Sequence, residues 1–102
     1  MIRFVEVINE TNFNSRLERT SQPQFALGEV WINEKYVVSL REATGYRKLL
    51  EEGRLPSDLD INHRFTALTT NNGSVTSTHV VVGELATVAA RVNRGEKVLL
   101  KG

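Results

Sequence analysis

Residues 66–92 of this 102-residue chain have the clearest secondary-structure pattern in the sequence. Two runs rich in Thr and Val, 66–70 and 74–82, flank an Asn-Asn-Gly tripeptide at 71–73. Thr and Val favour extended strands, and Asn and Gly tolerate the positive φ angles of a tight turn. A stripe at helical spacing follows, made of Leu85, Val88, Ala89 and Val92. The segment therefore predicts a β-hairpin followed by an amphipathic helix that packs on the sheet.

The N-terminal half predicts further strands. Residues 2–8 alternate between apolar and polar side chains, which indicates a first strand with Arg3 and Glu6 among its outward residues. Residues 9–24 are polar and rich in turn formers, so we expect a long loop there. A loop of this length in a compact domain is typically either mobile or functional.

Residues 25–42 predict a pair of strands joined by a turn at 33–35. Successive strand residues point to opposite faces, so Trp31 is expected on the face opposite to Val30 and Ile32. On the second strand, Val37 is expected opposite to Leu40 and paired with Trp31 across the strands.

Two helices are predicted outside the strands. A short helix is expected at 44–56, with Thr44 as its N-cap and Gly53 just past its end. The C-terminal helix is expected to stop at Gly95, and residues 97–101 are expected to form a final edge strand.

Together these elements predict a single domain of the α+β class. We expect a small, mainly antiparallel sheet of two hairpins and an N-terminal strand, with the C-terminal helix on one face and the short helix inserted mid-chain. The hairpin–helix unit is expected at 64–94, the inserted helix at 44–56 and the polar loop at 9–24.

Composition and charge restrict the partners of the chain. Thirteen basic and twelve acidic side chains give a net charge of +1, so the overall charge favours neither nucleic acid nor membranes as a partner. The absence of cysteine excludes disulfides, thiolate nucleophiles and zinc sites built on Cys, and favours a cytoplasmic protein. The longest apolar runs have three residues, far fewer than a membrane span needs.

Candidate catalytic and metal-binding residues are few. The two histidines, His63 and His79, lie far apart in the sequence, on a predicted loop and a predicted strand. The paired carboxylates at 51–52 and at 58 and 60 fall on a short helix and a polar loop, where ordinary surface charge explains them. The glycines are scattered and form no phosphate-binding loop. We therefore expect no enzyme activity, no metal and no cofactor.

Residues 30–92 resemble two families of small bacterial modules. From Ile32 the chain has an Ile-Asn-x-x-x-Val-Val-x-Leu strand, followed later by a Thr-rich strand, a Gly turn, a Val-rich strand and a helix. Flagellar proteins of the FlbD type resemble this order, as do RemA-type matrix regulators. The FlbD resemblance implies an accessory role, and the RemA resemblance implies oligomers that bind DNA through basic residues. The FlbD type lacks the 44–62 insertion, whereas the RemA type has a helix there.

Two functions remain open from the sequence. The first is a non-enzymatic interaction or assembly protein, a homo-oligomer whose partner interface uses the sheet face not covered by the C-terminal helix. That face is expected to present Trp31, Val37 and Leu68. The second is an oligomeric regulator that binds nucleic acid through the mid-chain helix and the flanking strands. Its candidate residues are Arg41, Tyr46, Arg47, Lys48, Arg54 and Arg64.

Overall fold

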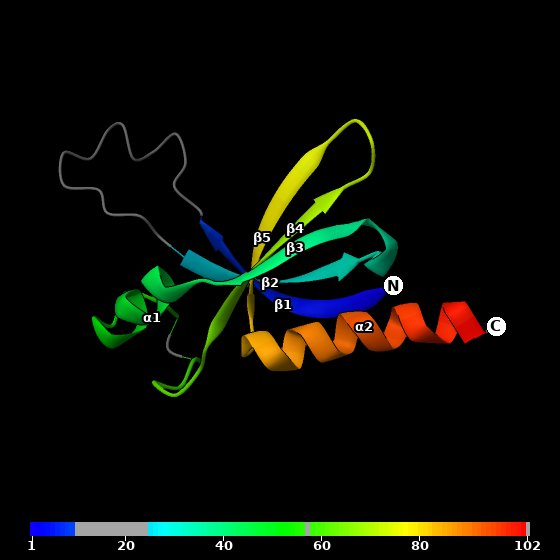
Figure 1. Cartoon of the computed structure of the whole chain (residues 1–102). Helices are drawn as coiled ribbons and strands as arrows, with labels where there is room; N and C mark the ends of the chain where they lie inside the picture. The colour runs from blue at the N-terminus through cyan, green and yellow to red at the C-terminus, as the bar shows by residue number, and fades with distance from the viewer. Residues whose placement is uncertain (10–24, 57, 102) are drawn as a thin grey trace.

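The computed structural model describes residues 1–9, 25–56 and 58–101, with side chains through residue 94. These residues form a five-stranded antiparallel sheet and two helices, which confirms the predicted α+β class (Figure 1). The strands are β1 (Ile2–Asn9), β2 (Phe25–Ile32), β3 (Val37–Glu42), β4 (Phe65–Asn71) and β5 (Thr76–Val82). The helices are α1 (Thr44–Glu51) and α2 (Leu85–Lys101), and a 3-10 helix spans Glu34–Tyr36. Of the loop predicted at 9–24, only Asn9 lies within the described residues.

The strands follow the order β2-β1-β5-β4-β3 across the sheet. The predicted pairing within residues 25–42 is therefore wrong, because β2 pairs with β1 and β3 pairs with β4. Trp31 lies opposite Arg3, and Val37 lies opposite Thr70. The predicted turn does form, since the Asn33 side chain accepts a hydrogen bond from the backbone N–H of Lys35. It connects two strands at opposite edges of the sheet instead of closing a hairpin.

The two helices cover opposite faces of the sheet and lie toward its opposite ends (Figure 1). The α2-side core is built from Phe4, Ile32, Leu68, Val81, Val88 and Val92. The α1-side core is built from Val7, Leu55 and Phe65, against which residues of α1 pack. Neighbouring residues on one strand belong to different cores: Val81 faces α2, while Val80 and Val82 pack on the α1 side. A sheet of this size is thus buried on both faces, each over part of its area.

A β-bulge shifts the register of β3 between Val37 and Ser39. The extra residue, Val38, has an exposed side chain. Because of this shift, Val37 and Leu40 both pack against the α2-side core. The prediction that Val37 lies on the face opposite to Leu40 is therefore wrong.

The β4–β5 hairpin and its connection to α2 match the prediction from residues 66–92. At the tip, the Asn72 side chain accepts hydrogen bonds from the backbone N–H groups of Ser74 and Val75, and Gly73 has a φ of 101°. Gly83 joins β5 to α2 with a φ of 151°, and a Cβ atom there would lie 3.0 Å from the Val88 side chain. Glycine is therefore required at this junction by backbone angle and by space.

The ends of the helices agree only in part with the prediction. Gly53 follows α1 as expected, and its N–H donates to Leu50 O while the N–H of Arg54 donates to Leu49 O, a Schellman pattern. Thr44 is the first helical residue, and Ala43 is the N-cap. Gly95 does not end α2, and the strand predicted at 97–101 is helical. A single interior glycine costs only about 1 kcal/mol relative to alanine, which the rest of a long helix offsets.

Candidate interaction surface

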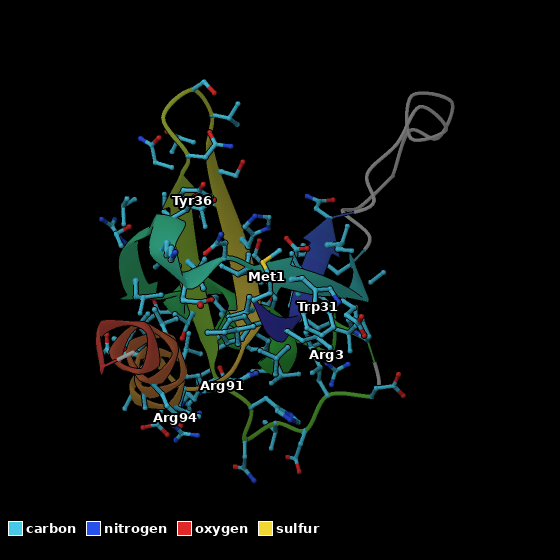
Figure 2. The ribbon with its side chains drawn as sticks, turned by 90° about the vertical axis from the view of Figure 1, so that its right-hand side faces the viewer. Met1, Arg3, Trp31, Tyr36, Arg91 and Arg94 are labelled. Atoms are coloured by element: carbon cyan, nitrogen blue, oxygen red, sulfur yellow. The ribbon has the colours of Figure 1, made fainter. Side chains whose placement is uncertain are left out.

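Four exposed residues of β1 and β2 lie together on the sheet face opposite to α2. They are Arg3, Val5, Glu29 and Trp31, and we refer to them as the Trp31 surface. Strand pairing places Arg3 beside Trp31 and Val5 beside Glu29. Figure 2 shows the Arg3 and Trp31 side chains next to one another. Trp31 remains 55% exposed and belongs to neither core.

Hydrogen bonds hold the indole of Trp31 in place. Trp31 Nε1 donates to Glu29 Oε1 at 2.9 Å, and Arg3 Nη1 donates to Glu29 Oε2 at 2.9 Å. These hydrogen bonds lower the pKa of Glu29 below its ordinary value, with the bond from Arg3 contributing most and that from Trp31 next. The Glu29 carboxylate is therefore kept ionised while it orients a cation and an indole on either side of it.

Arg91 of α2 contacts the same strand from the other face. Its guanidinium lies 4.5 Å from the centroid of the Phe4 ring, a cation–π geometry. Its Nη2 donates to the backbone oxygen of Arg3 at 2.7 Å. Figure 2 shows Arg91 and Arg94 on α2, on the other side of β1 from Trp31. Arg91 thus fastens α2 to β1 beneath the Trp31 surface.

The predicted interface residues do not share an exposed face. Leu68 is completely buried under α2, and Val37 is half-buried on that same side. Only Trp31 lies on the opposite, exposed face, so the predicted grouping of these three residues is wrong. Arg3, Val5 and Glu29 take their place beside Trp31. Alternation in residues 2–8 already predicts that Arg3 points outward, but the neighbours of Trp31 depend on the β1–β2 pairing.

The basic residues predicted for nucleic-acid binding fall into several environments. Tyr46 is half-buried, with its ring 6.0 Å from that of Phe25 and 6.1 Å from that of Phe65, measured between centroids. It is therefore part of the α1-side core and is not a free platform for stacking a base.

The charges near Tyr46 are partly paired with carboxylates. Arg47 forms an i,i+4 pair with Glu51 at 3.8 Å, and Arg54 lies 3.7 Å from Glu52. Arg64 is half-buried, and its Nη1 atom has no hydrogen-bond partner within the described residues. The remaining two candidates, Arg41 on β3 and Lys48 on α1, are exposed. Nucleic-acid binding stays a prediction, which duplex binding at low salt would test.

The two histidines make separate contacts. His63 Nδ1 accepts a hydrogen bond from the backbone N–H of Asp60 at 2.7 Å within a local turn. His79 Nδ1 lies 2.6 Å from Glu6 Oε2, on the α2-facing side of the sheet. Among the side chains described, those of residues 1–9, 25–56 and 58–94, no group of three or more potential ligands for a metal ion occurs.

No helix in the described part of the chain combines the length and apolar character needed to cross a membrane. Comparisons with protein-family models, with curated proteins and with solved structures give no match. The resemblance of residues 30–92 to the FlbD and RemA types therefore stays a prediction. The function proposed below rests on the geometry of the chain itself.

Proposed function

We propose that this chain is a non-enzymatic interaction protein that self-associates through the Trp31 surface. The observation that supports this most is the state of Trp31. Its large apolar side chain is mostly exposed, contributes to neither core, and is nevertheless fixed by a hydrogen bond to Glu29. An ordered but exposed indole loses little conformational entropy on binding.

The composition of the surface also favours protein–protein contact. Trp and Arg are the residues most enriched among those that dominate binding energy. Val5 adds exposed apolar area beside them, and the Arg3–Glu29 ion pair leaves no unbalanced charge among these four residues. A neutral surface with an aromatic centre suits another folded protein better than a nucleic acid.

The placement of the titratable groups supports a role without catalysis. His79 is bonded to Glu6 on β1, whereas His63 is bonded to the backbone of its own turn. Arg47 and Arg54 are paired with the glutamates at 51 and 52 near the end of α1. A general acid and a general base have to converge on one substrate, and these groups are distributed over separate elements.

The test is the dependence of the molar mass on concentration, measured by size exclusion with light scattering. We expect an oligomer at tens of micromolar for the natural chain. Trp31→Ala should shift the equilibrium toward the monomer, with at least a tenfold weaker association, because truncating a central interface tryptophan costs at least about 2 kcal/mol.

Tyr36→Ala is the matched control for this experiment. Tyr36 is also an exposed aromatic residue, 46% accessible, but it lies beside β3 and away from Trp31 (Figure 2). Its substitution should leave the molar mass unchanged. A natural chain that remains a clean monomer at tens of micromolar would contradict the proposed function.

A further inference from the structure

The outer edge of β2 lacks a strand partner among the described residues. Within residues 1–9, 25–56 and 58–101, β1 is the only strand that pairs with β2. Alternate backbone N–H and C=O groups along its eight residues therefore point away from the sheet without a strand partner. At about 3.3 Å per residue, this edge is about 26 Å long.

The two edges of the sheet differ in how they are protected against pairing. The β3 edge has six residues, is interrupted by the bulge at Val38, and ends in the charged pair Arg41-Glu42. Short length, bulges and charges are the features by which edge strands avoid further pairing. The β2 edge is longer, keeps a regular register with β1 throughout, and has Glu29 as its single charged residue. Only the β3 edge shows the protection expected of a strand that faces solvent.

We propose that β2 pairs antiparallel with β2 of a second copy, about a two-fold axis at Gly28. This pairing joins two five-stranded sheets into one sheet of ten strands. This inference rests on the proposed self-association, and it specifies the strand whose backbone hydrogen bonds join the two copies. A pairing of identical strands about a two-fold axis closes the assembly at a dimer.

Geometry and charge select the register. Directly opposed residues of an antiparallel pair lie on the same face, so the axis must pass through a residue of β2. An axis at Glu29 would place the two Glu29 side chains opposite one another, which is destabilising. An axis at Gly28 pairs all of residues 25–31 and opposes no like charges. Axes at Leu27 or Val30 keep only residues 25–29 or 28–32 in register.

This register brings aromatic side chains together on the face opposite to α2. Phe25 of one copy lies opposite Trp31 of the other. Phe25 already contacts Tyr46 edge-on, and Tyr46 contacts Phe65, so Trp31 of the second copy extends an existing aromatic cluster. Cross-strand aromatic pairs stabilise sheets beyond the area that they bury. The exposure of Trp31 in the single chain is thereby explained by its place in the second copy.

Small residues leave room for the pairing on the other face. The two Gly28 residues are opposed, and Ala26 of one copy lies opposite Val30 of the other. The Ile8 side chain lies over Gly28 so closely that a Cβ atom there would overlap with Ile8 Cδ1. Ile8 is itself exposed, and on pairing it covers the junction between the two sheets.

The chain has no cysteine, so single introduced thiols report the register without background. We choose Ala26→Cys and Val30→Cys, two small changes at positions opposed in this register. Their Cα atoms would be about 5 Å apart, within the range of a disulfide. Two copies of the same position would be separated by four residues along the strand, about 13 Å, which is too far.

Oxidation of a mixture of A26C and V30C should give a covalent dimer, seen by non-reducing electrophoresis and intact mass. Each variant alone should cross-link at least tenfold less, as should A26C mixed with V38C on the β3 edge. Leu27→Cys mixed with Glu29→Cys provides a second opposed pair on the other face, for use if V30C folds poorly.

The outcomes separate the two proposals. If light scattering shows a dimer but neither opposed pair cross-links selectively, the β2–β2 pairing is wrong and the proposed self-association still stands. Equal cross-linking of each variant alone overturns the Gly28 axis. If the chain is monomeric at tens of micromolar, both proposals are wrong. This is also the result expected if something other than a second copy covers the β2 edge.

Discussion

At the scale of single residues, Thr66 shows how one polar side chain fixes the junction between hairpin and helix. Thr66 is fully buried, and its Oγ1 donates to the backbone oxygen of Gly83 at 2.9 Å. Gly83 N in turn donates to the backbone oxygen of Arg64 at 2.8 Å. The two polar groups of Gly83 therefore hydrogen-bond to β4 and to the residue just before it, which fixes the segment that leads into α2. A buried polar group that loses its partner costs more than the bond itself contributes.

We therefore expect Thr66→Val to lower the free energy of unfolding by about 1–3 kcal/mol. Valine has nearly the same shape, but it leaves the Gly83 oxygen without its donor. Thr76→Val is the matched control, because Thr76 is an exposed residue of β5 and its replacement should change stability by less than about 0.5 kcal/mol. Urea unfolding measures both, and equal midpoints for the two variants would contradict the role assigned to the Thr66 hydroxyl.

At the scale of elements, a glycine inside α1 and a glycine just before α2 should respond oppositely to the same substitution. Gly45 lies in α1 with ordinary helical angles and no atom within 4 Å of an added Cβ. Gly45→Ala should stabilise the protein by up to about 1 kcal/mol, because alanine has the higher helix propensity. Gly83→Ala should destabilise it by more than about 1 kcal/mol, since the backbone angle and the Val88 contact both oppose a Cβ. Thermal unfolding measures both, and shifts of the same sign would refute this assignment.

The elements also show which parts of the fold are local. The turn at 71–73 and the end of α1 follow from short-range hydrogen bonds of Asn72 and from the backbone of Gly53, so both are recognisable in the sequence. The Val38 bulge and the extension of α2 through Gly95 are not recognisable in the sequence. The bulge lets Val37 and Leu40 both pack against the α2-side core, which local strand propensity does not encode. The interior position of Gly95 goes against local helix propensity.

At the scale of the whole molecule, self-association predicts that stability depends on protein concentration. A dimer that forms only from the folded state stabilises that state by mass action. The Tm of the natural chain should rise with concentration, whereas the Tm of Trp31→Ala should be nearly constant. Differential scanning calorimetry over a hundredfold range of concentration measures this. If the Tm of both proteins depends on concentration in the same way, Trp31 does not contribute to association.

Whole-molecule arrangement also decides which predicted functional residues reach the surface. Period-two alternation along β4 is enough to put Leu68 and Phe65 on opposite faces, but it does not specify which helix covers which face. The structure buries Leu68 under α2 and leaves Trp31 exposed. Likewise, Tyr46 has the spacing of a helix-face residue, and its partners Phe25 and Phe65 come from distant strands.

The α+β class, the β4–β5 hairpin with its turn, and the presence of two helices are all predictable from the sequence. These features depend on alternation, turn chemistry and helical spacing, which act over a few residues. The strand order, the burial of Leu68 and Val37, and the exposure of Trp31 come from the tertiary structure. So does the position of β2 at an edge of the sheet formed by the described strands. Hydrogen bonds between strands and burial beneath a helix join residues far apart in the chain, so no short segment specifies its partner.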